Sequence, residues 1–206
     1  MNFKLARENM VKQQILTSGF SLDGVAKIMA EIPREVFLPK EIQNLAYCDR
    51  NLFIGDKELK SPVFTAKLID SLSIKTSDNV LKLGLESAYT VALISKLCKY
   101  VEVIEYDDKE IELAKEHLKN INISNFEINN AEQIINIKKN KKKYNCIYIA
   151  NFVEENEIDD SLLELLEEGG RLVFVVRDDI SDKAYLITKK PNNVYEKIFL
   201  FNTYNK

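Results

Sequence analysis

The sequence predicts an α/β protein with a mostly parallel, seven-stranded sheet that ends in an antiparallel hairpin and follows a helical extension. Three observations predict this fold. From residue 79 onward, short apolar runs alternate with helical patterns, as in sheets covered by helices on both faces. Near the C-terminus, Pro191-Asn192-Asn193 separates two β-like runs. Between residues 1 and 50, apolar side chains recur at helical spacing.

Each element follows from the local pattern. Before the sheet, the sequence predicts helices around 10–15 and 25–29, a loop at 33–39 between two prolines, a short strand or extended arm at 51–55, and an amphipathic helix after Pro62. The sheet follows as strands 80–84, 101–105, 125–128, 145–150 and 171–176, alternating with helices 89–98, 108–119, 131–137 and 159–167, and then as hairpin strands 184–188 and 194–201.

Composition narrows the function class. The 206 residues carry 46% apolar and 30% charged side chains with a net charge of −3, so no basic field draws the chain to nucleic acid. No apolar run is long enough for a membrane span, and the N-terminus lacks the apolar core of a signal peptide. The three cysteines form no CxxC pair, so a cytoplasmic, reducing location is expected. No cluster of metal ligands is visible, and no oligomeric state follows.

The segment N-V-L-K-L-G-L-E-S-A-Y at residues 79–89 carries the strongest functional signal. A strand runs into Gly84, a helix begins near Tyr89, and a second strand ends in Glu105 about twenty residues later. Strand, glycine turn, helix, strand and acid is the arrangement by which an open α/β sheet holds an adenosine ribose. Gly84 and Glu105 are therefore candidate cofactor-binding residues, although Glu105 alone is also explained as an acid at a helix N-terminus.

The chain resembles protein-L-isoaspartate O-methyltransferases in a series of short motifs. Pro33-Arg34-Glu35, with Phe37 and Pro39, is similar to that family's P-R-E-x-F-x-P signature. Ala46-Tyr47 with Asp49 is similar to its A-Y-x-D motif, and residues 169–173 (G-G-R-L-V) to the strand that ends its sheet core. The matches run from about residue 6 to residue 176 in the expected order.

The resemblance implies a Rossmann-like class I methyltransferase fold that uses S-adenosyl-L-methionine and methylates isoaspartyl carboxylates of damaged proteins or peptides. Residues 1–62 would form the helical extension and substrate-side segment, and residues 63–206 the methyltransferase domain. The resemblance places Lys60 and Ser61 at the substrate. It assigns Gly84, Ser87, Tyr89, Glu105 and Asn130 to the cofactor. It implies no metal.

The chain departs from the family's pattern at the site itself. The second and third glycines of the turn are replaced by Glu86 and Ala88, and the family's serine position is Lys60, which is also explained as a solvated surface lysine. A carboxylate at Glu86 would lie near the carboxylate of the cofactor, and two like charges at ~4 Å repel by about 4 kcal/mol at an effective dielectric of ~20. Glu86 escapes this by pointing to solvent or by pairing with the cofactor's ammonium group.

Two further departures follow from the same comparison. The family's threonine position is Glu58, and the acid before its fourth strand is Asn145. His117, the only histidine, stands among acidic and basic residues in a helical pattern and is expected to be solvated.

Two functional hypotheses therefore remain open: a carboxyl methyltransferase, and a catalytically silent homologue with a binding or regulatory role. Nucleic-acid methylation is disfavoured because no N-P-P-Y-like motif follows the fourth strand, where Asn151 is followed by Phe152.

Overall fold

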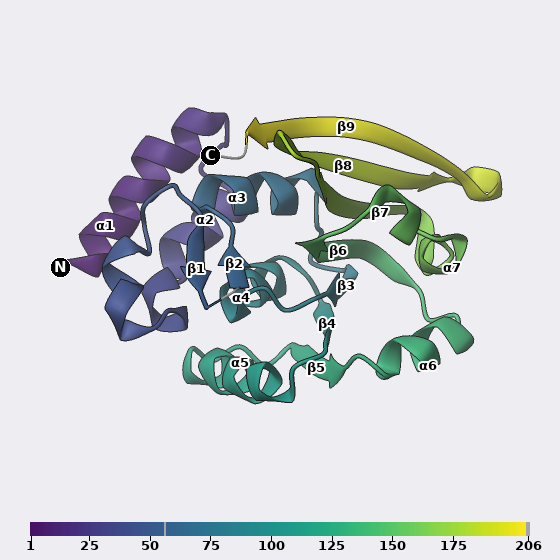
Figure 1. Cartoon of the computed structure of the whole chain (residues 1–206), viewed down its shortest axis with the longest axis horizontal. Helices are drawn as coiled ribbons and strands as arrows, with labels where there is room; N and C mark the ends of the chain where they lie inside the picture. Colours follow the sequence, from purple (N-terminus) through teal and green to yellow (C-terminus); the bar gives the residue numbers. More distant parts are fainter. Residues whose placement is uncertain (56, 205–206) are drawn as a thin grey trace.

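A computed structural model describes residues 1–55 and 57–204, and its centre is a seven-stranded sheet in the order β5-β4-β3-β6-β7-β8-β9 (Figure 1). The strands are β3 (Asn79–Leu83), β4 (Tyr100–Glu105), β5 (Phe126–Asn130), β6 (Tyr144–Phe152), β7 (Leu166–Arg177), β8 (Ser181–Lys190) and β9 (Val194–Tyr204). The first five are parallel, and β8 and β9 form the antiparallel hairpin. The predicted fold class is confirmed.

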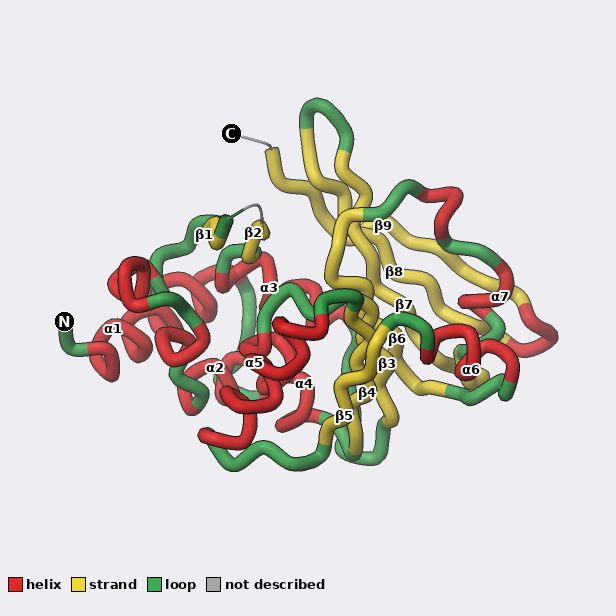
Figure 2. The backbone as a smooth tube through the Cα atoms, turned by 60° about the horizontal axis from the view of Figure 1, so that its bottom comes forward, coloured by secondary structure: helices red, strands yellow, loops and turns green. Residues whose placement is uncertain are grey.

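Helices cover both faces of this sheet (Figure 2). On one face, α3 (Pro62–Ser71), α4 (Ala88–Leu97) and α5 (Asp108–Asn120) share a core with Val80 of β3. On the other face, α6 (Gln133–Lys139) and α7 (Asp160–Leu163) pack with Leu81. Neighbouring residues of β3 therefore belong to different cores, as expected for a strand buried on both faces.

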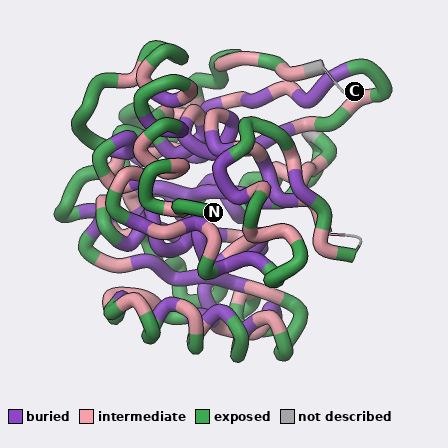
Figure 3. The backbone as a smooth tube through the Cα atoms, turned by 90° about the vertical axis from the view of Figure 1, so that its left-hand side faces the viewer, coloured by how far each residue is buried: buried purple, intermediate pink, exposed green. Residues whose placement is uncertain are grey.

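The N-terminal extension packs on the α3–α4 side. It comprises α1 (Phe3–Met10), the π-helix η1 (Val11–Ile15), the 3₁₀ turns η2 (Leu16–Ser18), η3 (Arg34–Phe37) and η4 (Lys40–Leu45), the helix α2 (Gly24–Glu31), and the small hairpin β1 (Leu52–Ile54) and β2 (Lys57–Leu59). Buried residues of α2 and α3 belong to one continuous core. Buried segments run through the interior of the molecule, and exposed ones lie at its periphery (Figure 3). The helical extension and the short strand near residue 52 are confirmed, and the division at residue 62 stays a prediction.

One predicted element is wrong. The expected helix 159–167 ends at Leu163, and strand β7 already begins at Leu166. Leu166 pairs with Tyr144 of β6, so this apolar side chain extends the sheet instead of a helix.

The remaining short turns are η5 (Glu155–Glu157) and η6 (Pro191–Asn193). Within the described residues, no helix has the length and apolar character needed to cross a bilayer.

Candidate functional site

The glycine turn lies at the carboxyl end of β3. Gly84 has φ +78°, a left-handed conformation that side chains disfavour, and its N–H donates to the carbonyl of Ile104 at 2.9 Å. A Cβ at Gly84 would lie 3.0 Å from Nδ2 of Asn151. The backbone conformation and the close approach of Asn151 both require glycine here.

Glu86 has a backbone conformation that is usual for glycine. Its φ is +53°, so the turn is left-handed at this position although the residue carries a side chain. Ser87 follows as the N-cap of α4, and its Oγ accepts from the N–H of Tyr89 at 3.1 Å. Ala88 opens the helix without positive φ, so only one of the two glycine replacements strains the backbone.

The side chains of Lys60 and Glu86 are buried against each other. Each side chain is 3% exposed, and Nζ of Lys60 lies 3.8 Å from Oε1 of Glu86. The same ammonium donates to the carbonyl of Ala150 and lies 4.7 Å from the ring centroid of Phe152. The expectation of a solvated Lys60 is therefore wrong, and Glu86 does not point to solvent. The two departures from the family's pattern contact each other.

Lys82 is a third buried charge at this turn, and sequence reasoning missed it. Its side chain is fully buried, and its ammonium donates to the carbonyls of Gly84 at 2.7 Å and Leu85 at 2.8 Å. Burial lowers the pKa of Lys82 to about 7, although the nearby carboxylate of Glu86 acts in the opposite direction. A lone charged residue in the middle of a strand buried on both faces was the available signal.

Arg34 completes a charge cluster, defined here as Arg34, Lys60, Lys82 and Glu86. The Nη2 of Arg34 donates to the carbonyl of Lys60 at 2.8 Å, and burial lowers the pKa of this guanidinium. Among the described residues, neither Nη1 of Arg34 nor Oε2 of Glu86 has a hydrogen-bond partner. The P-R-E motif therefore places a buried cation beside the turn.

Glu105 fastens the turn to the end of β4. Its Oε2 accepts from the N–H of Leu85 at 2.6 Å, and its Oε1 accepts from the N–H of Tyr106 at 2.6 Å and of Asp107 at 3.3 Å. Asn130 ends β5 directly opposite Glu105 in register, and its Nδ2 donates to Asp108 at 2.8 Å. The structure thus brings two of the predicted cofactor residues to adjacent strand ends.

Tyr106 is a further residue that sequence reasoning missed. It follows Glu105 directly, and its side chain is 78% exposed beside the same strand ends. An exposed ring offers a flat surface on which a base can stack. The signal was an aromatic residue immediately after the acid that ends the second strand.

Ser61 and Tyr89 make contacts that support the local structure. Ser61 is the N-cap of α3: its Oγ accepts from the N–H of Phe64 at 3.3 Å, and its own N–H donates to Oδ1 of Asn51 at 2.9 Å. Tyr89 is buried, with its ring centroid 5.7 Å from that of Phe37. Its hydroxyl has no partner within the described part of the chain.

The β1–β2 hairpin is tied to the main sheet through Arg177. The Nη1 of Arg177 donates to Glu58 at 2.7 Å, and its Nε donates to Asp182 at 2.7 Å. The guanidinium of Arg177 lies 3.5 Å from the ring centroid of Phe152. Burial alone would raise the pKa of Glu58, but hydrogen bonding and charge from Arg177 outweigh it and lower that pKa. The position of the family's threonine thus anchors the hairpin.

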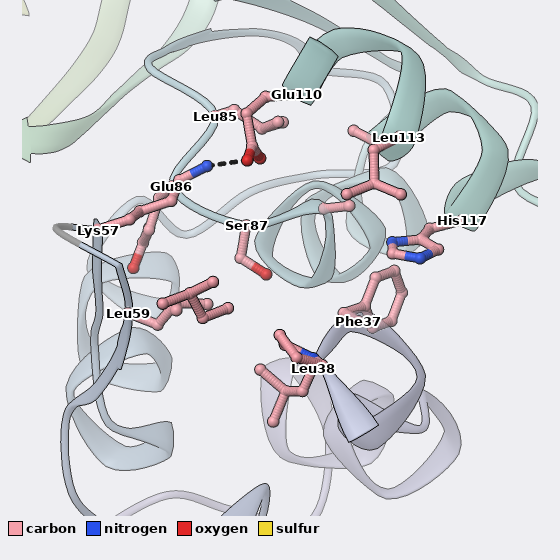
Figure 4. A pocket seen from close by; sticks show the side chains of 14 residues that line it. Phe37, Leu38, Lys57, Leu59, Leu85, Glu86, Ser87, Glu110, Leu113 and His117 are labelled. Atoms are coloured by element: carbon pink, nitrogen blue, oxygen red, sulfur yellow. Dashed lines mark hydrogen bonds and ion pairs between the residues drawn. The ribbon is translucent and has the colours of Figure 1, made fainter. Parts of the chain in front are cut away.

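A cavity of about 250 Å³ lies between the hairpin, the glycine turn and α5 (Figure 4). Its wall is largely apolar, and the ion pair of Lys57 with Glu110 at 2.7 Å crosses one side. His117 also borders it, with its ring edge-on to Phe37 at a centroid distance of 5.9 Å. The predicted solvated histidine is therefore half-buried, because an aromatic ring from the extension covers it.

Asn145 does not belong to the site. It lies near the start of β6, and its Oδ1 accepts from the N–H of Asn79 at the start of β3 with a distance of 2.9 Å. Because β3 and β6 are parallel, this edge of the sheet is opposite to the one that carries Gly84. Its substitution therefore leaves the glycine turn unaffected.

Comparison with known proteins agrees with this geometry. Residues 5–202 match the family described as Protein-L-isoaspartate(D-aspartate) O-methyltransferase (PCMT). The chain is 27% identical to Protein-L-isoaspartate O-methyltransferase 1 of Syntrophobacter fumaroxidans, over 94% of this chain and 90% of that protein. It is 31% identical to the Protein-L-isoaspartate O-methyltransferase of Methanoculleus marisnigri, over 82% of this chain and 76% of that protein.

A solved structure shows the same fold. It is a protein-L-isoaspartate O-methyltransferase of Plasmodium falciparum in complex with S-adenosyl-L-homocysteine, with a TM-score of 0.73 and 22% identity over 98% of this chain and 96% of that one. These findings confirm the family resemblance, and with the family its cofactor, S-adenosyl-L-methionine. The chain therefore belongs to the protein-L-isoaspartate(D-aspartate) O-methyltransferase family.

Proposed function

We propose that the protein methylates isoaspartyl carboxylates of damaged proteins or peptides, with S-adenosyl-L-methionine as the methyl donor. The observation that carries the proposal is the position of the hairpin segment, which is anchored by Arg177 and lies against the glycine turn through Lys60. A peptide that enters beside the hairpin would therefore meet the turn. Because none of the three cysteines is paired, a reducing cytoplasm is the proposed location.

The adenosine end of the donor fits the residues present. Gly84 gives the turn its left-handed backbone, and Glu105 and Asn130 lie side by side where ribose and base would be held. The three N–H groups on Glu105 fix its carboxylate in place, and Oε2, which accepts only one of them, has a second lone pair for a ribose hydroxyl. Tyr106 would cover the base.

Little further chemistry is needed from the chain. The bound donor supplies a methyl group on a positively charged sulfur. A carboxylate that attacks such a methyl group needs no general base, so the protein mainly has to align the reactants. Lys60 and Ser61 are both engaged within the structure, so their proposed role is to shape the segment beside the turn.

Transfer of a labelled methyl group to a peptide pair tests the proposal. The two peptides share one sequence and differ only in an isoaspartyl or aspartyl residue. The expected result is a base-labile methyl ester on the isoaspartyl peptide alone, lost in a Glu105→Ala variant that retains the native fold. Equal labelling of both peptides would contradict the substrate class, and no labelling at saturating donor would contradict the activity.

A catalytically silent homologue is the second candidate. The burial of Glu86 together with Lys60 favours it, because this pair fills space at the turn with charged side chains. A silent homologue would bind S-adenosyl-L-homocysteine or adenosine without transferring a methyl group to any peptide. Binding in calorimetry combined with no label on the isoaspartyl peptide would support this candidate over the first.

A further inference from the structure

The carboxylate of Glu86 lies beside the segment that leads into α3, and the Glu86 backbone leads into α4. Glu86 precedes Ser87, the N-cap of the ten-residue helix α4. The N–H of Lys60, just before the N-cap of α3, donates to Oε1 of Glu86 at 3.4 Å. Helix starts carry free N–H groups and the positive end of the helix dipole, so an anion is favoured at this junction.

Cations from separate elements surround the same carboxylate. The ammonium of Lys60 lies 3.8 Å from its Oε1. Lys82 from β3 and Arg34 from the extension both interact electrostatically with Glu86, and both are buried. A buried carboxylate that accepts a backbone N–H beside a helix start and lies among buried basic side chains occupies a built anion site. Here a side chain of the same chain fills that site.

The cofactor would reach this anion site. In open α/β sheets, the acid at the end of the second strand holds the ribose, and the rest of the ligand extends over the glycine turn toward the helix start. Glu105 is that acid, and it is bonded to the N–H of Leu85 in the turn. Glu86 is the next residue. The amino-acid tail of a ligand held at Glu105 therefore extends toward Glu86.

We infer that Glu86 is a built-in occupant of the anion site that the carboxylate of the cofactor's amino-acid tail would otherwise use. The inference rests on the proposed binding of adenosine at Glu105. Because the site is already filled, the amino-acid tail contributes no affinity. The protein selects its ligand through the adenosine and sulfur portion.

Calorimetric titration with a matched ligand pair tests this. 5′-Methylthioadenosine has the adenosine and the sulfur but no amino-acid tail, whereas S-adenosyl-L-homocysteine has all three. The wild type is expected to bind the two with affinities within about threefold of each other, because the tail gains no charge-assisted hydrogen bond. Tighter binding of S-adenosyl-L-homocysteine by roughly tenfold or more, the size of one such bond, would overturn the inference.

Variants of Glu86 distinguish a filled anion site from simple charge repulsion of the cofactor's carboxylate. Glu86→Gly empties the site and should tighten S-adenosyl-L-homocysteine by roughly tenfold or more, while 5′-methylthioadenosine changes little. Glu86→Gln removes the charge but keeps the volume, so a similar gain in this variant would show repulsion and overturn occupancy. The Lys60→Ser, Glu86→Gly double variant repeats the comparison without a buried unpaired Lys60 ammonium.

The same titrations give a different result if the proposed function itself is wrong. If the wild type binds neither ligand, and neither do the Glu86 variants, then the adenosine site at Glu105 is absent. That result contradicts the proposed function and removes the basis of the inference. Binding of 5′-methylthioadenosine by all variants, with a large preference of the wild type for S-adenosyl-L-homocysteine, contradicts the inference alone.

Discussion

The ammonium of Lys60 lies 3.8 Å from the carboxylate of Glu86, and each of the two side chains is 3% exposed. Both residues stand where the family's pattern has an uncharged residue: Glu86 replaces a glycine of the turn, and Lys60 replaces a serine. Considered separately, each substitution would bury an unpaired charge. Their contact means that each residue supplies the charge that the other requires.

Removing one partner of this pair should lower the free energy of unfolding by more than removing both partners. Glu86→Gly leaves the Lys60 ammonium buried without its partner, and loss of one partner of a buried pair costs about 3–5 kcal/mol. The Lys60→Ser, Glu86→Gly double variant removes both charges and the left-handed glutamate. Urea unfolding of the wild type, the two single variants Glu86→Gly and Lys60→Ser, and the double variant should show a coupling of about 1–3 kcal/mol in favour of the double variant. Additive effects would contradict the pairing.

Lys82 should make stability depend on pH above neutrality. The unfolded chain keeps this proton up to a pKa of roughly 10.4, whereas the folded chain loses it at a pKa of about 7 because burial disfavours the charge. Between these values the unfolded state binds more protons, so the free energy of unfolding rises with pH, by at most about 1.4 kcal/mol per unit.

Lys82→Met should remove this rise. Urea unfolding at several values between pH 7 and 9.5 measures it, with Lys75→Met at an exposed position as the matched control. The control should keep the slope of the wild type. An unchanged slope in the Lys82→Met variant would show that another group is responsible.

Gly84→Ala should destabilise more than Gly169→Ala. Both glycines have similar left-handed φ values, +78° and +75°. A Cβ at Gly169 meets open space, whereas a Cβ at Gly84 lies 3.0 Å from Nδ2 of Asn151. The backbone contributes about 1 kcal/mol in each case, so the excess at Gly84 measures the contact with Asn151. In an Asn151→Ala background the excess should disappear, as thermal unfolding would show.

Only one of the three cysteines should react in the folded protein. Cys48 is exposed, whereas burial raises the pKa of Cys98 to about 12 and that of Cys146 to about 11. The thiolate is the reactive form, so the two buried thiols are protected by low ionisation as well as by burial. A disulfide reagent should titrate one thiol in buffer and all three in guanidinium chloride. A second fast thiol in buffer would contradict the packing at Cys98 or Cys146.

Much of the fold could be predicted because strands buried on both faces leave continuous apolar runs. The same rule explains the failure at Leu166, whose apolar neighbours fit a helix and a strand equally well until its pairing with Tyr144 is known. Gly84 and Glu105 were also predictable, since topology alone brings neighbouring strand ends together.

The charge cluster was not predictable from local patterns. Lys60 and Glu86 are 26 positions apart, and nothing local indicates that their side chains turn inward toward each other. Lys82 was different, because a single lysine between Leu81 and Leu83 in a buried strand is a visible exception. A buried charge requires a nearby partner or a shifted pKa, so this exception was a signal for the charge cluster that sequence reasoning did not use.

The anchor between Glu58 and Arg177 should control the hairpin more than the whole fold. Glu58→Gln removes one charge from a partly exposed pair, so global stability should fall by at most about 1 kcal/mol. Local opening of residues 57–59 should nevertheless become several-fold faster in hydrogen exchange, because the bonds to Arg177 tie the hairpin to the sheet. Glu110→Gln is the matched control, since it breaks the more exposed pair with Lys57 in the same hairpin.

The effect should also have a definite pH dependence. The pKa of Glu58 is lowered in the folded protein, so its contribution is present above its unfolded value of roughly 4.3 and is lost as the pH falls through the folded value. The exchange rates of wild type and Glu58→Gln should therefore differ at pH 6 and converge as the pH falls through the lowered pKa of Glu58 in the folded protein. A difference that persists in acid would indicate that the shape of the side chain, rather than its charge, holds the hairpin against Arg177.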